Sequence, residues 1–352
     1  MIFLVLPYNF CTGWGICSIN LAKEISKKHK IKYVSTEFAD ANRSNIIQHE
    51  FFKKSLFTDI DYLKNKNNYP IIQAIQHDLS PYIDYLSGKP KIAITFADRK
   101  IPKELAEKAK HYDYIVAGSE WCKKILNSHG VNSIVIHQGI DPLVFNPSRS
   151  EKCFFPDDFL IFSGGKFEPR KGQDITIKAY KVLQDKYPDV KLVCNWPNAY
   201  TGINGKDALT EAGIDLNRVI FVELFNNTYM ADIYQNTDIG VFPSRCEAGT
   251  NLVMMEYMAC GKPAIGTVRT GQADLLNSIN GLPLNSSGNY LLKDEAGDVI
   301  SVWEEPDLDH LIHLLEWSYN NRSKIKKLGK EASKTMSQKT WSHMADGVLK
   351  LI

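Results

Sequence analysis

The sequence predicts an α/β protein built from two doubly wound domains. Three observations lead to this expectation. The 352 residues are about twice the length of a typical domain. The composition, 44% hydrophobic and 23% charged, is that of a globular chain rather than a disordered or fibrous one. Short apolar runs alternate with amphipathic stretches, which is typical of βαβ units and parallel sheets.

The first half of the chain begins with an apolar run that we expect to form a buried strand. A loop that contains glycine leads from this strand into an amphipathic helix, predicted over Cys17–Lys28. Ser119 is a typical helix N-cap and precedes another helix. The predicted strands are Ile2–Leu6, Ile31–Ser35, Ile71–Ile75, Lys91–Thr95, Tyr114–Ala117 and Ser133–Ile136.

A polar segment without periodicity, residues 146–152, indicates a linker between the two halves. We therefore expect one domain over residues 1–150 and a second over 151–335. Residues 336–352 would form a terminal helix that crosses back to the first domain. The predicted strands of the second half are Phe159–Ser163, Val190–Asn195, Val219–Phe221, Ile239–Phe242 and Ala264–Thr267, and its helices are Gln173–Lys186, Met230–Asn236 and Leu252–Ala259.

Charge is distributed unevenly along the chain. The 42 Lys and Arg against 40 Asp and Glu give a net charge of +2, which does not favour a nucleic-acid partner. Residues 1–150 hold 20 basic and 14 acidic residues, so the first half is basic. Such a half could face an anionic acceptor or make a peripheral membrane contact, although scattered solvated lysines would give the same excess.

The seven cysteines are scattered, and none forms a Cys-x-x-Cys pair or a Cys/His cluster. We therefore expect neither a disulfide framework nor a zinc site. The opening apolar run is too short for a signal peptide, and no stretch approaches the roughly 20 apolar residues of a membrane span. These features predict a cytoplasmic protein, with a peripheral position at the inner membrane face as the second expectation.

In doubly wound folds, ligands bind at the carboxyl ends of the strands, which predicts a site in a cleft between the two halves. The most informative segment follows the predicted strand Ile239–Phe242. Glu247 lies in the loop, and Glu256 lies within the next helix among apolar residues. The amides that open this helix would suit a phosphate, and a partly buried Glu256 would accept hydrogen bonds from sugar hydroxyls. The residues at the helix start are Gly249, Thr250, Asn251 and Leu252.

A second loop, after the predicted strand Phe159–Ser163, combines glycine with lysine. Gly165 permits a close backbone approach, and Lys166 and Lys171 can both point at a diphosphate. Two lysines in a loop are often only solvated charges. Their presence beside the glutamate segment favours a ligand role.

Together the two loops resemble motifs of the retaining glycosyltransferases of family 4, whose GT-B fold has two Rossmann-like domains facing a central cleft. The resemblance implies that Glu247 contacts the donor sugar, Glu256 the ribose hydroxyls, and the two lysines the diphosphate. Eight residues separate the glutamates, one more than is common in the family. Lys166 replaces the usual arginine, which keeps the charge and loses the bidentate fork.

The resemblance is looser in the first half. Gly13 and Gly15 lie where the family has a glycine-rich turn that touches donor phosphates and acceptor. Many relatives also carry a histidine after the strand that corresponds to Lys91–Thr95, and this chain has none there. His77 and Asp98 are therefore the candidate contacts to the sugar or acceptor, although a lone histidine beside a strand end is more often structural.

The resemblance implies transfer of a sugar from a UDP- or GDP-sugar to an acceptor hydroxyl with retention of configuration. The acceptor would be a glycan, a lipid-linked molecule or a small molecule. Glu247, Lys166 and Lys171 would be the catalytic residues. Because lysines and helix amides can stabilise a leaving diphosphate, we expect no metal and no other cofactor.

Other functions of the same fold remain open, namely a sugar-nucleotide epimerase, a phosphorylase and a non-catalytic sugar-nucleotide-binding protein. A nicotinamide dehydrogenase is disfavoured, because no Gly-x-Gly-x-x-Gly follows the first predicted strand.

Overall fold

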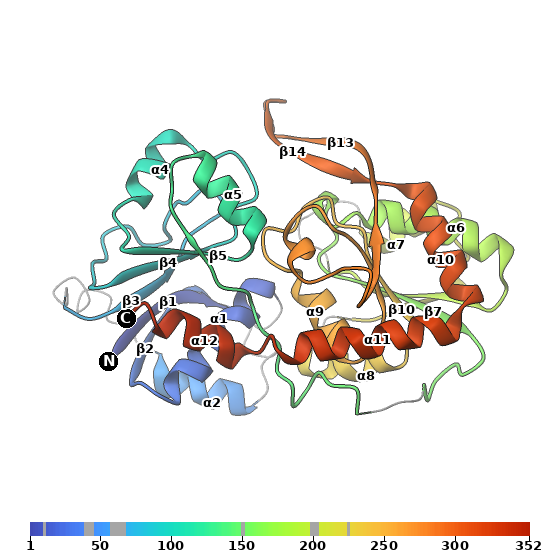
Figure 1. Ribbon diagram of the computed structural model, residues 1–352, viewed down its shortest axis with the longest axis horizontal. Helices are drawn as coiled ribbons and strands as arrows, with labels where there is room; N and C mark the ends of the chain where they lie inside the picture. The colour runs from blue at the N-terminus through green and yellow to red at the C-terminus, as the bar shows by residue number, and fades with distance from the viewer. Residues whose placement is uncertain (10–11, 39–45, 57–67, 149–151, 198–203, 224–225) are drawn as a thin grey trace. The chain divides into compact units, whose positions relative to one another are not determined.

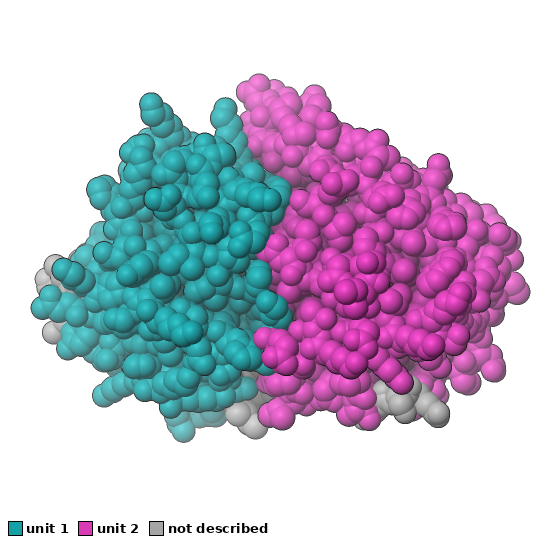
Figure 2. All heavy atoms as spheres, viewed as in Figure 1, with its two compact units in different colours: residues 1–139, 225–227, 339–352 teal, residues 140–224, 228–338 magenta. Residues whose placement is uncertain are grey.

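The chain forms two compact units in the computed structural model (Figure 2). Unit 1 comprises Met1–Gly139, Phe225–Asn227 and Lys339–Ile352, and unit 2 comprises Ile140–Leu224 and Thr228–Gln338. The units separate after Gly139, whereas the boundary predicted at residue 150 lies outside the described residues. The structure describes residues 1–9, 12–38, 46–56, 68–148, 152–197, 204–223 and 226–352.

Unit 1 is built on a parallel sheet with the strand order β2-β1-β3-β4-β5-β6 (Figure 1). Its strands are β1 Ile2–Tyr8, β2 Ile31–Phe38, β3 Ile71–Ala74, β4 Lys91–Thr95, β5 Tyr114–Ala117 and β6 Ile134–Val135. Its helices are α1 Gly13–Ser26, α2 Ile46–Ser55, α4 Lys103–Ala109, α5 Glu120–Ser128 and α12 Trp341–Leu349. All six strands fall close to the predicted runs.

The terminal helix α12 packs on α1 inside unit 1. The Cys17 thiol contacts the Met344 sulfur at 3.8 Å, and Lys28 forms an ion pair with Asp346. Gly139 lies directly against the backbone of Thr340, because a Cβ there would be 2.2 Å from the Thr340 carbonyl carbon. Residues at the far end of the chain thus complete the first unit.

Unit 2 repeats the architecture, with a parallel sheet in the order β12-β11-β10-β7-β8-β9. Its strands are β7 Phe159–Gly164, β8 Val190–Asn195, β9 Val219–Phe221, β10 Ile239–Phe242, β11 Ala264–Thr267 and β12 Leu282–Leu284. Its helices are α6 Gln173–Lys186, α7 Gly205–Glu211, α8 Met230–Gln235, α9 Leu252–Ala259, α10 Leu308–Asn320 and α11 Arg322–Ser337.

Helices cover both faces of this second sheet. Along β7, Phe159 and Ile161 join an apolar cluster with residues of α6 and α10, while Leu160 and Phe162 join a cluster with residues of α8, α9 and α11. Successive side chains of a strand point to opposite faces, so a strand covered on both faces is a continuous apolar run. The predicted α/β fold with two doubly wound domains is confirmed.

Unit 2 also contains a hairpin that the sequence pattern did not predict. Strands β13 Ser286–Lys293 and β14 Val299–Pro306 pair antiparallel and form a separate two-stranded sheet. Figure 1 shows the hairpin as a long twisted ribbon that leads into α10. Tyr290 and Trp303 stack on one of its faces, with ring centroids 6.1 Å apart.

Candidate functional site

Glu247 is the centre of a buried charge cluster at the carboxyl end of β10. Its side chain accepts hydrogen bonds from Lys171 Nζ at 2.6 Å, Arg170 Nη1 at 2.9 Å and Ser244 Oγ at 2.9 Å. Its main chain is held as well, because its N–H donates to Thr270 Oγ1 at 3.0 Å. The structure thus brings together two predicted residues, Glu247 and Lys171.

The two loops meet because the strands before them are neighbours. β7 and β10 pair in parallel, so their carboxyl ends lie side by side. Gly172, between the loop and α6, has φ +68°, and a Cβ there would lie 2.0 Å from the Pro243 carbonyl oxygen. Only glycine allows this approach, which brings Lys171 against the Glu247 loop.

The cluster balances its own charge. Burial alone would raise the pKa of Glu247, but Lys171 and Arg170 outweigh it and hold the pKa below its usual value. Burial lowers the pKa of Lys171, although Glu247 opposes this shift. Arg170 also binds Glu168, at 2.6 Å, so two cations face two carboxylates. The Glu247 carboxylate is ionised at neutral pH.

The glycine turn after β7 is fixed by a side chain of α6. Gly165 has φ +112°, and its N–H donates to the Asn195 carbonyl oxygen at 3.0 Å. Gln173 donates to the carbonyl oxygens of Lys166 at 2.7 Å and Gly165 at 3.3 Å. These bonds hold the backbone that carries Lys166, the second predicted lysine of the loop, whose side chain is partly exposed.

The start of α9 is ordered by its cap. Asn251 has φ +60°, and its side chain accepts a hydrogen bond from the Met254 N–H at 3.3 Å. Gly249 and Thr250 precede the cap, and Leu252 is the first helical residue. All four residues are buried. Amides at a helix start are donors with a positive end of the helix dipole behind them, which suits an anion.

Glu256 lies one turn inside α9 and is 3% exposed. Tyr234 of α8 donates to its Oε2 at 3.2 Å. Tyr234 itself packs edge-on against Phe162, with ring centroids 5.0 Å apart. The predicted acid is thus more completely buried than expected and is oriented by a tyrosine in an aromatic core.

The glycine turn of unit 1 differs from the prediction. Gly13 and Gly15 lie in the first turn of α1, not in a loop before it, because Thr12 acts as the N-cap and accepts from the Gly15 N–H at 3.2 Å. A Cβ at Gly15 would lie 1.8 Å from the Asn9 carbonyl oxygen, so this glycine is required. A Cβ at Gly13 would contact nothing within 4 Å.

His77 and Asp98 lie together at the carboxyl ends of β3 and β4. His77 Nδ1 is 2.9 Å from the Phe96 carbonyl oxygen and 3.4 Å from Asp98 Oδ1. The Asp98 side chain is 3% exposed and accepts from Arg99 Nε at 3.0 Å. The His77 side chain is 44% exposed. With Nδ1 directed at these oxygens, its Nε2 is the nitrogen that remains for a ligand.

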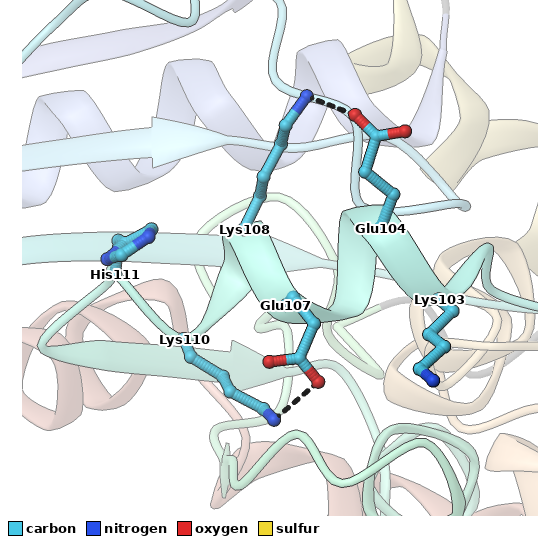
Figure 3. Close-up of a pocket in the computed structure, with 6 residues that line it drawn as sticks. All are labelled: Lys103, Glu104, Glu107, Lys108, Lys110 and His111. Carbon is cyan, nitrogen blue, oxygen red and sulfur yellow. Dashed lines mark hydrogen bonds and ion pairs between the residues drawn. The ribbon is translucent and has the colours of Figure 1, made fainter.

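A shallow pocket in unit 1 does not add to this site (Figure 3). Its charged side chains form ion pairs along one helix, Lys108 with Glu104 and Lys110 with Glu107, each at 2.7 Å. Exposed pairs of this kind are solvated and weak. The lining residues all come from α4 and the two positions after it, namely Lys103, Glu104, Glu107, Lys108, Lys110 and His111.

Across the described parts of the chain, no three His, Cys, Asp or Glu side chains lie close enough together to hold a metal ion. None of the helices in these described residues is long and apolar enough to cross a membrane.

Sequence reasoning missed several residues that hold the predicted ones. Arg170 precedes Lys171 directly, and spacing alone cannot show that both of these adjacent cations reach the same distant acid. Ser244 and Thr270 act on Glu247 through single hydrogen bonds. Tyr234 was visible only as an aromatic residue of a predicted helix.

Part of unit 2 matches a known protein family. Residues 158–294 match the family described as "Glycosyl transferases group 1". The phosphatidyl-myo-inositol mannosyltransferase of Propionibacterium freudenreichii subsp. shermanii is 27% identical over 195 residues, which cover 54% of this chain and 46% of that protein. The chain thus spans less than half the length of this curated relative.

Solved structures match the whole chain. Sucrose-phosphate synthase from Thermosynechococcus elongatus superimposes with a TM-score of 0.73 at 14% identity, covering 99% of this chain and 97% of that one. HepE of Anabaena, solved in complex with UDP and glucose, gives 0.71 at 16% identity, covering 99% and 98%. The chain therefore has the GT-B fold, and residues 158–294 of its second unit are similar to the group 1 glycosyl transferases.

Proposed function

We propose that the protein transfers a sugar from a nucleotide-diphospho-sugar to an acceptor hydroxyl with retention of configuration. The observation that carries this proposal is the pair of cations, Lys171 and Arg170, that bind the buried Glu247 carboxylate at the adjoining ends of β7 and β10. It lies within the part of the chain that matches the glycosyl transferase family.

The donor diphosphate would change the balance of this cluster. A diphosphate brings negative charge to a place where two cations already serve two carboxylates. Lys171 would turn from Glu247 to the phosphate oxygens, and the released carboxylate would accept hydrogen bonds from the sugar hydroxyls. Lys166 would add a second cation from the same loop. These groups stabilise the charge that grows on the departing nucleoside diphosphate.

The amides at the start of α9 would bind the same phosphates. The amides of Gly249, Thr250 and Leu252 are the proposed donors, and Glu256 would accept from the ribose hydroxyls. The acceptor hydroxyl would attack the anomeric carbon of the sugar on the face from which the diphosphate leaves. The bond to the diphosphate would break, and a phosphate oxygen would take the proton of the hydroxyl. This route requires no side chain as general base, and lysines with helix amides supply the positive potential without a metal.

The relatives suggest which substrates to test first. HepE was solved with UDP and glucose. The curated relatives include a phosphatidyl-myo-inositol mannosyltransferase and a D-inositol 3-phosphate glycosyltransferase. We therefore propose a UDP-sugar as the first donor and an inositol-type polyol as the first acceptor. His77 and Asp98 of unit 1 are the proposed acceptor contacts. Peripheral attachment to a membrane surface stays a separate, weaker proposal, which rests only on the basic first half.

The test is release of nucleoside diphosphate from a panel of UDP- and GDP-sugars, with and without inositol-type acceptors. We expect acceptor-dependent release from one donor, and the anomeric coupling constant of the product, measured by NMR, to match that of the donor. Absence of release from every donor, or a product of inverted configuration, would overturn the proposal. Isomerisation of the sugar without release would indicate an epimerase.

A further inference from the structure

Arg245, two residues before Glu247, has every guanidinium N–H engaged. Nε and Nη2 donate to the two oxygens of Glu305, each at 2.6 Å. Nη1 and Nη2 donate to the two oxygens of Asp174 at 2.8 and 2.7 Å, and Nη1 also donates to the Pro169 carbonyl oxygen at 2.7 Å. A guanidinium has five N–H donors, so the set is complete.

This arginine is buried although its partners are not. Arg245 is 4% exposed, whereas the side chains of Asp174 and Glu305 are 48% and 27% exposed. Its guanidinium carbon lies 4.4 Å from the centre of the Tyr290 ring. The two carboxylates raise the pKa of Arg245 despite its burial, so the charge is permanent. Bidentate pairs of this kind fix direction as well as distance.

The partners come from three different parts of unit 2. Pro169 begins the 3-10 helix Pro169–Lys171, and Asp174 lies in the first turn of α6. Glu305 belongs to β14, and Tyr290 to β13. We call residues 243–251 the Glu247 loop and residues 165–172 the lysine loop. The Arg245 side chain, which belongs to the Glu247 loop, therefore connects the lysine loop to the β13–β14 hairpin.

Arg170 makes the reverse connection. It reaches from the lysine loop to the Cys246 carbonyl oxygen at 3.0 Å and to Glu247. The backbone adds a third link, since the Arg245 N–H donates to the Arg170 carbonyl oxygen at 2.9 Å. The two arginines thus connect the two loops in opposite directions, and Arg245 also reaches the hairpin.

We propose that Arg245 is a positioning residue that sets Lys171 against Glu247, and that its pair with Glu305 makes the β13–β14 hairpin part of the scaffold of the donor site. The effect that we expect on kcat/KM rests on the proposed function. The structural consequence of the inference, that breaking a hairpin contact loosens the Glu247 loop, does not depend on substrate.

Two neighbouring residues of β14 provide the test. Glu305→Gln removes the charge that faces Arg245. Glu304, the preceding residue of β14, has a half-exposed side chain that pairs with Arg269 at 3.3 Å, and Glu304→Gln serves as the control. We expect Glu305→Gln to lower kcat/KM for the donor about 10-fold, mainly by raising KM. A 10-fold change corresponds to about 1.4 kcal/mol. Glu304→Gln should match the wild type. Arg245→Lys keeps the charge but loses the fork, and should resemble Glu305→Gln.

Hydrogen exchange without ligand separates this inference from the proposed function. In Glu305→Gln, peptides covering residues 166–172 and 243–249 should exchange faster than in Glu304→Gln, with the sheet strands unchanged. Faster exchange in these loops supports the inference even if the wild type transfers no sugar. Absence of sugar transfer would count only against the proposed function. Equal exchange and equal kinetics in Glu304→Gln, Glu305→Gln and Arg245→Lys would overturn the inference. If Glu305→Gln does not fold, the comparison of Arg245→Lys with Glu304→Gln decides.

Discussion

The carboxyl ends of the two parallel sheets carry different chemistry. In unit 2 this edge holds a network in which Lys171 and Arg170 each bind the buried Glu247 carboxylate within 3 Å. In unit 1 the same edge holds the start of α1 and the His77–Asp98 pair, with His77 half exposed. Both units are built on a parallel sheet, although the strand order differs, and the chemical contrast lies in the loops that follow the strands.

The contrast indicates what each edge can bind. A buried network of opposite charges is organised before a ligand arrives, and it suits a diphosphate whose charge grows during reaction. A partly exposed imidazole oriented by a buried acid suits a neutral hydroxyl that can vary between substrates. Variants on the two edges should therefore affect different kinetic constants.

Lys171→Met should have the largest effect. It removes the cation closest to Glu247 and to the proposed diphosphate site. Loss of a charged hydrogen bond costs about 1.5–3 kcal/mol, so kcat/KM for the donor should fall about 10- to 150-fold. Steady-state release of nucleoside diphosphate measures this. Lys178→Met, on an exposed position of α6, is the control, and equal activity of the two variants would exclude Lys171 from the site.

Glu256→Gln should act on nucleotide affinity. The amide keeps the shape and the Tyr234 bond but accepts more weakly than a carboxylate, so we expect about a 10-fold rise in Kd, or about 1.4 kcal/mol. Isothermal titration with the nucleoside diphosphate measures the change, with Glu211→Gln on the exposed side of α7 as control. An unchanged Kd would mean that Glu256 serves only the core of α8 and α9.

Apart from β12, the strands of both sheets could be predicted from sequence, because strands covered on both faces are continuous apolar runs. The hairpin could not. Its strands mix serine, glycine and charged residues, and its anchor is an arginine 60 residues earlier in the chain. A side-chain contact over that distance leaves no local periodicity.

The same limit applies to the candidate site. Motif spacing pointed to Glu247 and Lys171 as separate ligands, yet they bind each other across 76 residues. Spacing also could not show that Arg170 binds the same carboxylate as Lys171. The start of α1 at Gly13 was missed for another reason, because two glycines suggested a loop while Thr12 capped a helix.

His77→Ala should show the smaller effect expected of unit 1. Loss of one neutral hydrogen bond costs about 0.5–1.5 kcal/mol, so KM for the acceptor should rise about 3- to 10-fold with KM for the donor unchanged. Initial rates with each substrate varied in turn measure both constants. His111→Ala, on an exposed position after α4, is the control. A rise confined to the donor KM would contradict the division of roles between the two edges.

Removal of divalent metal should have the smallest effect, and it tests the charge balance of the donor edge directly. If Lys171, Lys166 and the amides before α9 supply the positive potential, kcat/KM measured in EDTA should stay within about twofold of the untreated value, or about 0.4 kcal/mol. The chain contains two Asp-x-Asp sequences. Asp307 and Asp309 lie at the start of α10, where Asp307 caps the helix by accepting from the His310 N–H at 2.9 Å, and Asp59 and Asp61 lie outside the described residues. Loss of turnover in EDTA, restored by magnesium or manganese, would show that a metal shares the stabilisation of the leaving group. Lys171→Met would then be expected to lose less activity with metal present than without it.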